Sequence, residues 1–315
     1  MTLRVLVPSD DFVRDFGINH GKITHPNIDV AVWNIDDGRA APEADMLVTH
    51  HPLVSGTKDR LREMTSLRHV HLMSLGYDWI TPVLPPNATL SNSRGAIEDS
   101  TAEMGIALIL AGLRELPSHV RHQHQQLWRD PYTSSLQQST VLILGYGGLG
   151  TALEERLIPF KPKDIIRVAS TARTTPSGQQ IHAQDELPAL LPTADVVIVA
   201  VPLTDSTRNL VDAHFLELMA DASLLVNIGR GGVVDTSALV AELTSGRLRA
   251  CLDVVEPEPL PAGHPLWSLE NCLLTPHVAA NTHATTALLA KLAREQILAI
   301  AQGKTPANVI ELARV

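Results

Sequence analysis

The sequence contains few aromatic residues, few cysteines and no long apolar run. Phe, Trp and Tyr make up 3% of the 315 residues, which is too few for the stacking surfaces of proteins that bind single-stranded nucleic acid. The formal net charge is −9, whereas a nucleic-acid-binding protein needs a clustered basic face. No run approaches the roughly 18 apolar residues of a membrane span. We therefore expect no nucleic-acid partner and no membrane partner.

The scarcity of cysteine argues against a disulfide framework. Cys251 and Cys272 are the two cysteines, and both lie inside apolar runs, which predicts buried, reduced thiols. The first eight residues read as a strand and lack the longer apolar stretch of a signal peptide. These features predict a cytoplasmic protein.

Short runs rich in β-branched and aliphatic residues alternate with helical or loop segments as far as residue 92. Their composition is typical of buried parallel strands. The predicted strands span residues 3–7, 29–33, 46–49 and 69–73. A first domain with a parallel sheet is therefore expected.

Between residues 95 and 128 the pattern changes to that of one long helix. Apolar residues recur there at helical spacing, namely Ala102, Ile106, Ile109, Leu110 and Leu113. The carboxylates and hydroxyls of residues 98–101 suit the unpaired amides of a helix start. Near its end come His119, His122 and His124, but no Cys or carboxylate completes a ligand set. We expect a solvated helix end there and no metal.

A second block of alternating strands and helices covers residues 139–276. Its predicted strands are 140–144, 165–169, 195–201, 223–227, 248–254 and 271–274. Strands separated by helical stretches predict a parallel, doubly wound sheet. The last predicted helix, 282–301, offers Leu288, Leu289, Leu292 and Ile297 for one apolar face.

That last helix has no strands of its own nearby, so we expect it to pack on the N-terminal block. The predicted architecture is α/β with two Rossmann-like, doubly wound domains, the first of them discontinuous, and a cleft between them. The first domain, 1–96 with 284–315, is expected to bind substrate, and the second, 97–283, to bind a dinucleotide.

A glycine-rich loop follows the first strand of the second block. It reads Gly145-Tyr146-Gly147-Gly148-Leu149-Gly150 and leads into a predicted helix. A strand, a G-x-G-x-x-G turn and a helix in this order let the backbone approach a pyrophosphate at the helix N-terminus. The whole loop is therefore a candidate cofactor site.

The end of the next strand bears on the choice of cofactor. An acidic residue about 20 positions after the glycines accepts hydrogen bonds from the ribose of NAD, but residues 169–174 contain no carboxylate. They offer Arg173 with Ser170, Thr171 and Thr174, a cation and hydroxyls suited to a 2′-phosphate. We therefore expect NADP(H) to be favoured over NAD(H).

Three charged or titratable residues follow strands of the second block and suggest the chemistry of 2-keto acids. Arg230, flanked by glycines, can bind a carboxylate bidentately. His277 can donate a proton to a keto oxygen, and Glu258 would hold its tautomer and keep it protonated. Glu256 competes with Glu258 for this role, and spacing alone does not separate them.

These residues belong to a set of motifs that resembles the D-isomer-specific 2-hydroxyacid dehydrogenases along nearly the whole chain. The segments that carry the likeness are Ser74-Leu75-Gly76-Tyr77-Asp78, Thr101-Ala102-Glu103, the glycine loop, Val201-Pro202-Leu203-Thr204, NIGRGGVVD at 227–235, LDVVEPEPLP at 252–261 and LLTPHVAA at 273–280. The resemblance assigns the family's catalytic arginine, glutamate and histidine to Arg230, Glu258 and His277. Its glutamate lies five residues after the aspartate that is here Asp253, which favours Glu258 over Glu256.

The resemblance also implies cofactor and substrate contacts and an assembly. Besides the glycine loop and residues 170–174, the implied cofactor contacts are Thr101, Val201, Pro202, Thr207, Ile228, Gly229, Asp253 and Ala279. Backbone amides of Leu75 and Gly76 would bind the substrate carboxylate together with Arg230 and His277. A homodimer clasped through residues 100–126 is implied as well.

Two segments bear on the substrate pocket. The substrate loop of the family has a small residue and a valine beside its glycine, whereas this chain has Leu75 and Tyr77, so the size of the pocket stays open. His50-His51-Pro52 follows the third predicted strand, and His51 is a candidate pocket residue.

The sequence thus predicts an NADPH-preferring reductase of a small 2-keto acid, such as glyoxylate or hydroxypyruvate. One alternative is an NAD-dependent 3-phosphoglycerate dehydrogenase, for which Lys58, Arg60 and Arg62 are candidate phosphate ligands. An alternative of another class is an NAD(P)(H)-sensing protein resembling the corepressors that share the fold.

Overall fold

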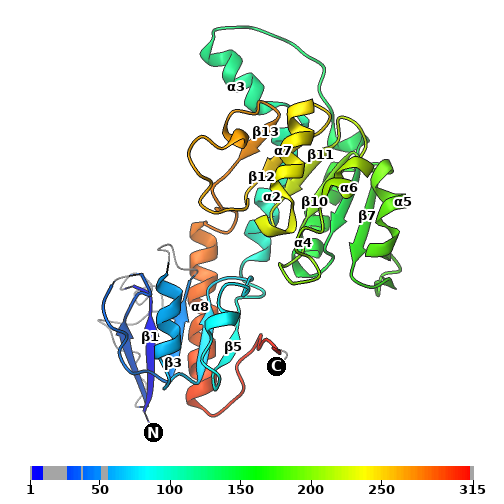
Figure 1. The fold of residues 1–315 in the computed structure, drawn as a ribbon. Coiled ribbons are helices and arrows are strands. Elements are labelled where there is room, and N and C mark those ends of the chain that lie inside the picture. Colours follow the sequence, from blue (N-terminus) through cyan, green and yellow to red (C-terminus); the bar gives the residue numbers. More distant parts are fainter. Residues whose placement is uncertain (1, 10–26, 37, 51–55, 313–315) are drawn as a thin grey trace. The chain divides into compact units, whose positions relative to one another are not determined.

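The computed structural model describes residues 2–9, 27–36, 38–50 and 56–312. The chain divides into two compact units: unit 1, Met1–Ile97 with Thr282–Val315, and unit 2, Glu98–Asn281. Each unit has its own largely parallel β-sheet flanked by helices (Figure 1). The expectation of an α/β fold with two parallel sheets and a discontinuous first unit is confirmed.

Unit 1 contains a five-stranded, all-parallel sheet in the order β2-β1-β3-β4-β5. Its strands are β1 (Leu3–Val7), β2 (Ile28–Val32), β3 (Met46–Thr49), β4 (His69–Leu72) and β5 (Thr89–Ser91). Two short 3₁₀ helices follow β3 and β4, namely η2 (Thr57–Glu63) and η3 (Thr81–Val83). Strand β5 was not predicted; it pairs with β4 and forms one edge of the sheet.

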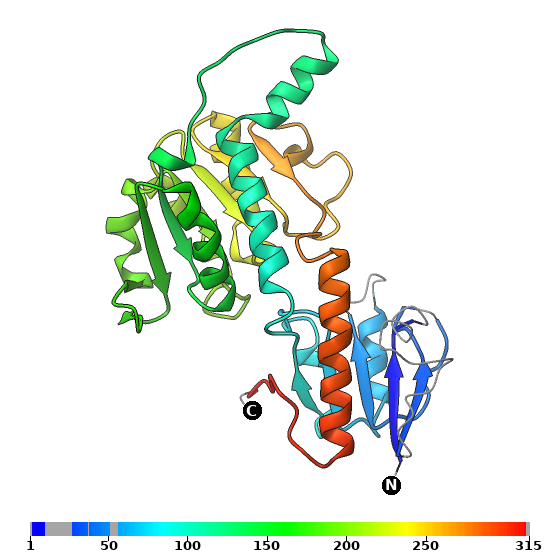
Figure 2. The same cartoon turned by 180° about the vertical axis from the view of Figure 1, so that it is seen from behind.

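The C-terminal helix α8 (His283–Ala301) covers one face of this sheet (Figure 2). Thr282 caps it, since its hydroxyl accepts a hydrogen bond from the Thr285 N–H at 3.0 Å. Ala290, Ala293 and Ile297 pack against the sheet residues Val5, Val7, Met46 and Val48. The predicted return of this helix to the N-terminal block is therefore confirmed. Its predicted apolar face was partly wrong, because the Leu288 side chain is 41% exposed.

Unit 2 contains an eight-stranded sheet in the order β13-β12-β11-β10-β6-β7-β9-β8. Its strands are β6 (Thr140–Leu144), β7 (Asp164–Ala169), β8 (Arg173–Thr174), β9 (Gln180–Ala183), β10 (Val196–Val199), β11 (Leu224–Asn227), β12 (Arg249–Leu252) and β13 (Cys272–Leu274). All pair in parallel except β8 with β9. The strand order reverses between β6 and β10, and ligands of such sheets bind at the carboxyl ends of the strands at this point.

Helices cover both faces of the unit 2 sheet, and strand residues alternate between them. Helices α2 (Glu98–Leu113) and α4 (Gly148–Leu157) pack with Val141 and Ile143 on one face. Leu142 and Leu144 face the other side, against α6 (Ala213–Leu218) and α7 (Thr236–Ser245). The remaining helices are short: η4 (Leu136–Gln138), η5 (Ile158–Phe160), η6 (Gln184–Glu186), α5 (Leu187–Leu190), η7 (Leu191–Thr193), η8 (Gly231–Val233) and η9 (Pro265–Trp267).

The predicted single helix over 95–128 is wrong, because two helices occupy this region. Helix α2 begins at Glu98, as predicted, and ends at Leu113, and α3 (Leu116–His124) follows after a break. Glu115 at the break has a left-handed backbone with φ of 52°. Pro117 explains the break, since it lacks the N–H that would continue the hydrogen bonds of α2.

Both cysteines are free thiols in the described structure, as predicted, with Cys251 buried and Cys272 partly buried. Burial raises the pKa of each thiol to about 12, so both stay protonated and unreactive near neutral pH. Among the helices that the described residues form, none combines the length and apolar character needed to cross a membrane.

Candidate cofactor and catalytic site

The glycine loop lies at the carboxyl end of β6, beside the reversal of strand order. Gly145 has φ of +110°, and a Cβ there would lie 2.7 Å from the carbonyl carbon of Ala200. A Cβ at Gly150 would lie 2.4 Å from the Gly145 carbonyl oxygen, so this glycine lets α4 pack closely on the loop. A Cβ at Gly147, by contrast, would meet no described atom within 4 Å. The open backbone at Gly147 fits a pyrophosphate that approaches the N-terminus of α4.

Residues 170–174 follow β7 and are exposed. The sequence indicated a loop here, but Arg173 and Thr174 form strand β8, which pairs antiparallel with β9. The Arg173 guanidinium donates a hydrogen bond from Nη2 to the Tyr146 carbonyl oxygen at 2.9 Å. This hydrogen bond joins β8 to the glycine loop.

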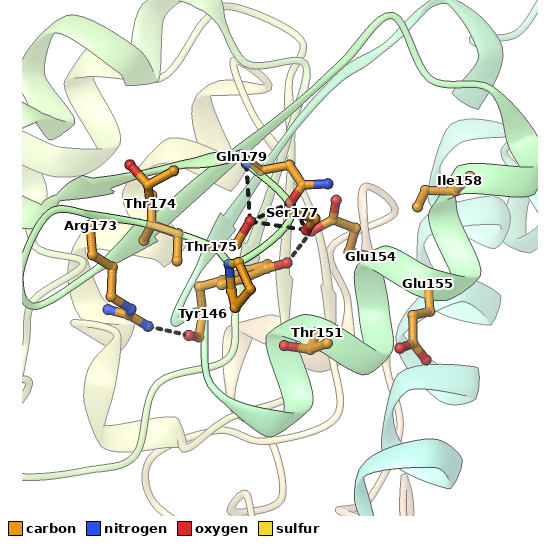
Figure 3. Close-up of a pocket in the computed structure, with 12 residues that line it drawn as sticks. Tyr146, Thr151, Glu154, Glu155, Ile158, Arg173, Thr174, Thr175, Ser177 and Gln179 are labelled. Atoms are coloured by element: carbon orange, nitrogen blue, oxygen red, sulfur yellow. Dashed lines mark hydrogen bonds between the residues drawn. The ribbon is translucent and has the colours of Figure 1, made fainter.

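A cavity of about 550 Å³ opens beside this hydrogen bond (Figure 3). The Tyr146 ring extends across it, with Arg173 and Thr174 on one side and α4 on the other. Its remaining lining residues are Thr151, Glu154, Glu155, Ile158, Thr175, Pro176, Ser177, Gln179 and Ile181. The cation and hydroxyls that the sequence suggested for a 2′-phosphate thus border a hollow beside the glycine loop.

Arg230 follows β11 in a tightly packed turn. The side-chain amide of Asn227, the last residue of β11, accepts from the Gly229 N–H at 3.1 Å and donates to the Arg230 carbonyl at 3.1 Å. A Cβ at Gly231 would lie 1.9 Å from the Val255 carbonyl oxygen, so no larger residue fits without moving the chain. These contacts fix the backbone on both sides of Arg230.

His277 and Glu258 form a hydrogen-bonded pair. The His277 Nδ1 lies 2.8 Å from Glu258 Oε2, and Glu258 Oε1 accepts from the Val255 N–H at 3.0 Å. Burial alone would raise the pKa of the Glu258 carboxyl, but the hydrogen bond and charge of His277 outweigh it and lower the pKa. The positive charge of Arg230 also lowers the pKa of the Glu258 carboxyl. His277 and Arg230 therefore both interact with Glu258.

Asp253 holds the segment that carries His277. Its carboxylate, 2% exposed, accepts from the Thr275 hydroxyl at 2.6 Å and from the N–H groups of Val278 and Ala279 at 3.0 Å each. The Asp253 carbonyl oxygen accepts from the His277 N–H at 2.7 Å. His277 itself has a left-handed backbone with φ of 54°, which is uncommon for a residue other than glycine. The bonds to Asp253 stabilise this conformation.

Comparison with known proteins places the chain in a family. Residues 106–279 match the NAD binding domain of the D-isomer specific 2-hydroxyacid dehydrogenases. The chain belongs to this family. A glyoxylate reductase/hydroxypyruvate reductase of Mus musculus is 30% identical over 306 residues, which cover 90% of this chain and 91% of the relative. A glyoxylate reductase of Aeropyrum pernix is 34% identical over 268 residues, 80% of this chain and 78% of the relative.

The fold agrees with solved structures of such enzymes. The crystal structure of an NADPH-dependent glyoxylate/hydroxypyruvate reductase from Sinorhizobium meliloti, in complex with NADP and malonate, superposes with a TM-score of 0.81 at 25% identity. The match covers 98% of this chain and 97% of that one. The protein is therefore an NAD(P)-dependent D-2-hydroxyacid dehydrogenase-family enzyme with a nicotinamide-cofactor-binding domain.

The other cofactor contacts implied by the family lie at several places in unit 2. Val201 and Pro202 follow β10, and the Thr207 hydroxyl donates to the Pro202 carbonyl at 2.6 Å and accepts from the Thr204 N–H at 2.8 Å. Thr207 thus closes the turn after β10. Thr101, Ile228 and Ala279 are buried, on α2, after β11 and after β13 respectively.

The substrate loop implied by the family, Leu75 and Gly76, lies in unit 1. Leu75 and Gly76 follow β4, and their carbonyl oxygens accept hydrogen bonds from Asn92 Nδ2 at 2.9 Å and from the Ser74 hydroxyl at 2.8 Å. This loop is therefore held in place by side chains of its own unit. His51 lies outside the described residues.

The basic residues that a phosphoglycerate substrate would need lie on η2 in unit 1. Arg60 donates to the Ile35 carbonyl at 3.2 Å, and Arg62 forms an ion pair with Asp59 at 3.4 Å. Lys58 lies on the same short helix. Two of the three cations thus already have partners within their own unit.

Sequence reasoning missed Thr275, Glu154 and Arg167, which make close contacts around the predicted residues. Thr275 donates to Asp253, while Glu154 accepts hydrogen bonds from both Arg167 and the Tyr146 hydroxyl. A signal existed for Thr275, because it stands two residues before His277 at a strand end. Nothing in the periodicity of the sequence indicated the other two.

Proposed function

We propose that the protein is an NADPH-preferring reductase of small 2-keto acids such as glyoxylate or hydroxypyruvate. The 2.8 Å contact between His277 Nδ1 and Glu258 Oε2 carries the proposal. It leaves the other ring nitrogen of His277 for a substrate, and the charge of Arg230 acts on the same Glu258 carboxylate. A proton donor and a cation in one site are what the reduction of a keto acid needs.

In the proposed mechanism, Arg230 binds the substrate carboxylate bidentately and orients the keto group. The glycine loop would hold a reduced nicotinamide cofactor, which would supply the hydride for the carbonyl carbon. His277 donates a proton from Nε2 to the keto oxygen, which becomes the hydroxyl of the product. Glu258 accepts the hydrogen bond of Nδ1–H, which holds the tautomer and the orientation of the ring. The N–H groups of Leu75 and Gly76 are proposed to bind the carboxylate as well.

The proposed preference for NADPH rests on Arg173 and its neighbours. The segment after β7 offers a guanidinium with Ser170, Thr171 and Thr174, and no carboxylate is present between residues 169 and 174. A carboxylate at this position would repel a 2′-phosphate, whereas a guanidinium binds it. The Sinorhizobium meliloti relative is NADPH-dependent by its description.

The first test is the initial rate of NADPH and NADH oxidation with glyoxylate, hydroxypyruvate, pyruvate and phenylpyruvate. We expect turnover with NADPH to exceed that with NADH, and glyoxylate and hydroxypyruvate to be reduced fastest. In the reverse direction, 3-phosphoglycerate with NAD tests the dehydrogenase alternative. Tight cofactor binding without turnover of any acid would instead favour the nucleotide-sensing alternative and contradict the proposal.

Replacing Arg230 tests its proposed role on the substrate. We expect Arg230→Ala to lower kcat/KM for the keto acid about 100-fold or more, because the charged, bidentate contact is lost. Arg230→Lys should restore only part of the loss, since an ammonium lacks the planar fork. Titration of NADPH by fluorescence should give a dissociation constant close to that of the wild-type protein. A collapse of NADPH affinity in Arg230→Ala would show that the arginine serves the cofactor instead.

We also propose that the enzyme is a cytoplasmic homodimer joined through helices α2 and α3. Support comes from α3 and the segment after it, where apolar side chains are exposed: Leu116, Val120, Leu127, Trp128 and Tyr132. An apolar surface of this kind is typical of a protein–protein interface.

A further inference from the structure

Three side chains from three elements of unit 2 meet under the glycine loop. The hydroxyl of Tyr146, in the loop, donates to Glu154 Oε2 on α4. Arg167 on β7 donates to the same oxygen from Nε at 2.7 Å and to Glu154 Oε1 from Nη2. The Arg167 guanidinium also lies 5.9 Å from the centre of the Tyr146 ring, within the range of a cation–π contact. We call these residues the Tyr146 cluster.

The Tyr146 cluster is largely shielded from water, since the side chains of Glu154 and Arg167 are 7% and 15% exposed. Burial alone would raise the pKa of the Glu154 carboxyl, but the bonds from Arg167 and Tyr146 lower it. Burial, together with the bond to Glu154, raises the pKa of the Tyr146 hydroxyl, so that group stays a neutral donor. A shielded ion pair often adds little to stability compared with apolar residues. The role of this ion pair is therefore to fix the position of a neighbouring group and not to add stability.

The position that the Tyr146 cluster fixes is that of Arg173. The carbonyl oxygen of Tyr146 accepts from Arg173 Nη2 at 2.9 Å, and Figure 3 shows this bond at the opposite end of Tyr146 from the bond to Glu154. Tyr146 is therefore held through its side chain and in turn holds the guanidinium. Movement of the Tyr146 ring would shift the carbonyl that orients Arg173.

The cluster also acts on the electrostatics of the cavity that Arg173 lines. Glu154 lines the same cavity, and an unpaired carboxylate there would repel a phosphate. Arg167 and the Tyr146 hydroxyl occupy both of its oxygens. The pairing therefore offsets the negative charge of Glu154, while Arg173 keeps its positive charge.

We propose that Tyr146 is a specificity-determining positioning residue. Its hydroxyl, anchored by Glu154 and Arg167, fixes the carbonyl that orients Arg173 toward the 2′-phosphate of NADPH. The inference rests on the proposed preference for NADPH and deepens it. It adds that the selectivity for NADPH over NADH depends on the Tyr146 hydroxyl. This hydroxyl bonds to the protein and does not need to contact the 2′-phosphate.

The test is a double-mutant cycle on cofactor binding. Dissociation constants of NADPH and NADH are measured by fluorescence titration for wild type, Tyr146→Phe, Arg173→Ala and the double variant. We expect Tyr146→Phe to weaken NADPH about tenfold and NADH less than about twofold, the scale of one lost hydrogen bond to a charged group. In the Arg173→Ala background, Tyr146→Phe should leave the NADPH/NADH ratio unchanged, since the group it positions is gone.

Glu242→Gln is the matched control, because Glu242 pairs with Arg247 at 2.6 Å elsewhere in unit 2. It removes a comparable ion pair and should leave both cofactor affinities unchanged. Equal losses for NADPH and NADH in Tyr146→Phe, with a wild type that prefers NADPH, would overturn the role of Tyr146 alone. The role of Tyr146 would also be overturned if Tyr146→Phe changed the ratio of the NADPH and NADH dissociation constants in the Arg173→Ala background. A wild type that binds both cofactors equally would instead overturn the NADPH preference, and the selective role of Tyr146 with it.

Discussion

At the scale of single residues, the backbone of His277 depends on a carboxylate that has no acid–base role in the proposed mechanism. Asp253 accepts hydrogen bonds from Thr275, Val278 and Ala279 with both of its oxygens. An uncommon left-handed conformation costs on the order of 1–3 kcal/mol and persists only where its surroundings enforce it. We therefore regard Asp253 and Thr275 as positioning residues for the proton donor.

Thr275→Val tests this dependence, since valine keeps the shape of threonine but cannot donate to Asp253. We expect kcat for keto-acid reduction to fall about tenfold, because a hydrogen bond to a charged group is worth roughly 1.5–3 kcal/mol. The NADPH dissociation constant should change little. Thr275→Ser retains the hydroxyl and should recover most of the rate. Wild-type kcat in Thr275→Val, measured by NADPH absorbance, would contradict the positioning role.

The sequence pointed to Arg230, Glu258 and His277 because polar residues after buried strands converge at one edge of a parallel sheet. It left Glu256 and Glu258 open until the resemblance favoured one, and in the structure Glu258 contacts His277. The contact of Asp253 with Thr275 joins the ends of the neighbouring strands β12 and β13. The periodicity of a sequence does not show which strands lie side by side. The Tyr146 cluster escaped notice for the same reason.

At the scale of elements, a buried histidine on β4 is bonded to β5 and to the segment that follows β5. His71, 0% exposed, lies on β4, with Nδ1 3.0 Å from the Ser91 hydroxyl and Nε2 3.4 Å from the Ser93 hydroxyl. Ser93 in turn donates to the Leu72 carbonyl at 2.7 Å. Burial lowers the pKa of His71 from 6.5 to about 4.

This lowered pKa predicts an acid-sensitive unit 1. Between pH 6.5 and 4 the unfolded chain binds a proton at His71 that the folded chain does not, so stability falls as the pH drops through this window. From pH 8 to pH 5 we expect a loss of about 2 kcal/mol from this residue. Urea unfolding at both pH values measures it.

His71→Gln is the comparison, since glutamine keeps a hydrogen-bonding side chain and does not titrate. Its free energy of unfolding should fall less on acidification, by about the same 2 kcal/mol. Equal pH dependence in the two proteins would show that His71 does not carry the effect.

Strands made of continuous apolar runs were predictable, whereas short strands without such a run were not. Strands such as β6 and β10 are continuous apolar runs, which indicate buried parallel strands. Strand β8 consists of two exposed polar residues, and β5 has three residues after a proline-rich turn. Such segments become strands only because a neighbouring strand offers backbone partners. The break between α2 and α3 could have been predicted from Pro117.

At the scale of the whole molecule, the assembly is expected to involve α3. Within the described ranges, no residue of α3 is fully buried. Leu116 and Val120 are 50% and 51% exposed, and their spacing puts them on one face of the helix. Trp128, a few residues further on, is 99% exposed.

Val120→Glu tests whether this surface joins two copies of the chain. We expect the dimer dissociation constant to rise at least about tenfold, because a charge would be buried in an apolar contact. Sedimentation velocity over a range of concentrations measures it. Leu288→Ser removes an exposed apolar side chain on α8 and should leave the dimer intact. A wild-type monomer at all concentrations would contradict the proposed assembly.

The return of α8 to the sheet of unit 1 has a consequence for synthesis on the ribosome. In the sequence, unit 2 (Glu98–Asn281) separates the strands of unit 1 from the helix that covers them. At roughly 5–20 residues per second these 184 residues take on the order of 10–40 s to translate. Throughout that time Val5, Val7, Met46 and Val48 lack the cover that α8 gives them. The nascent chain therefore leaves an apolar sheet face uncovered until α8 has emerged.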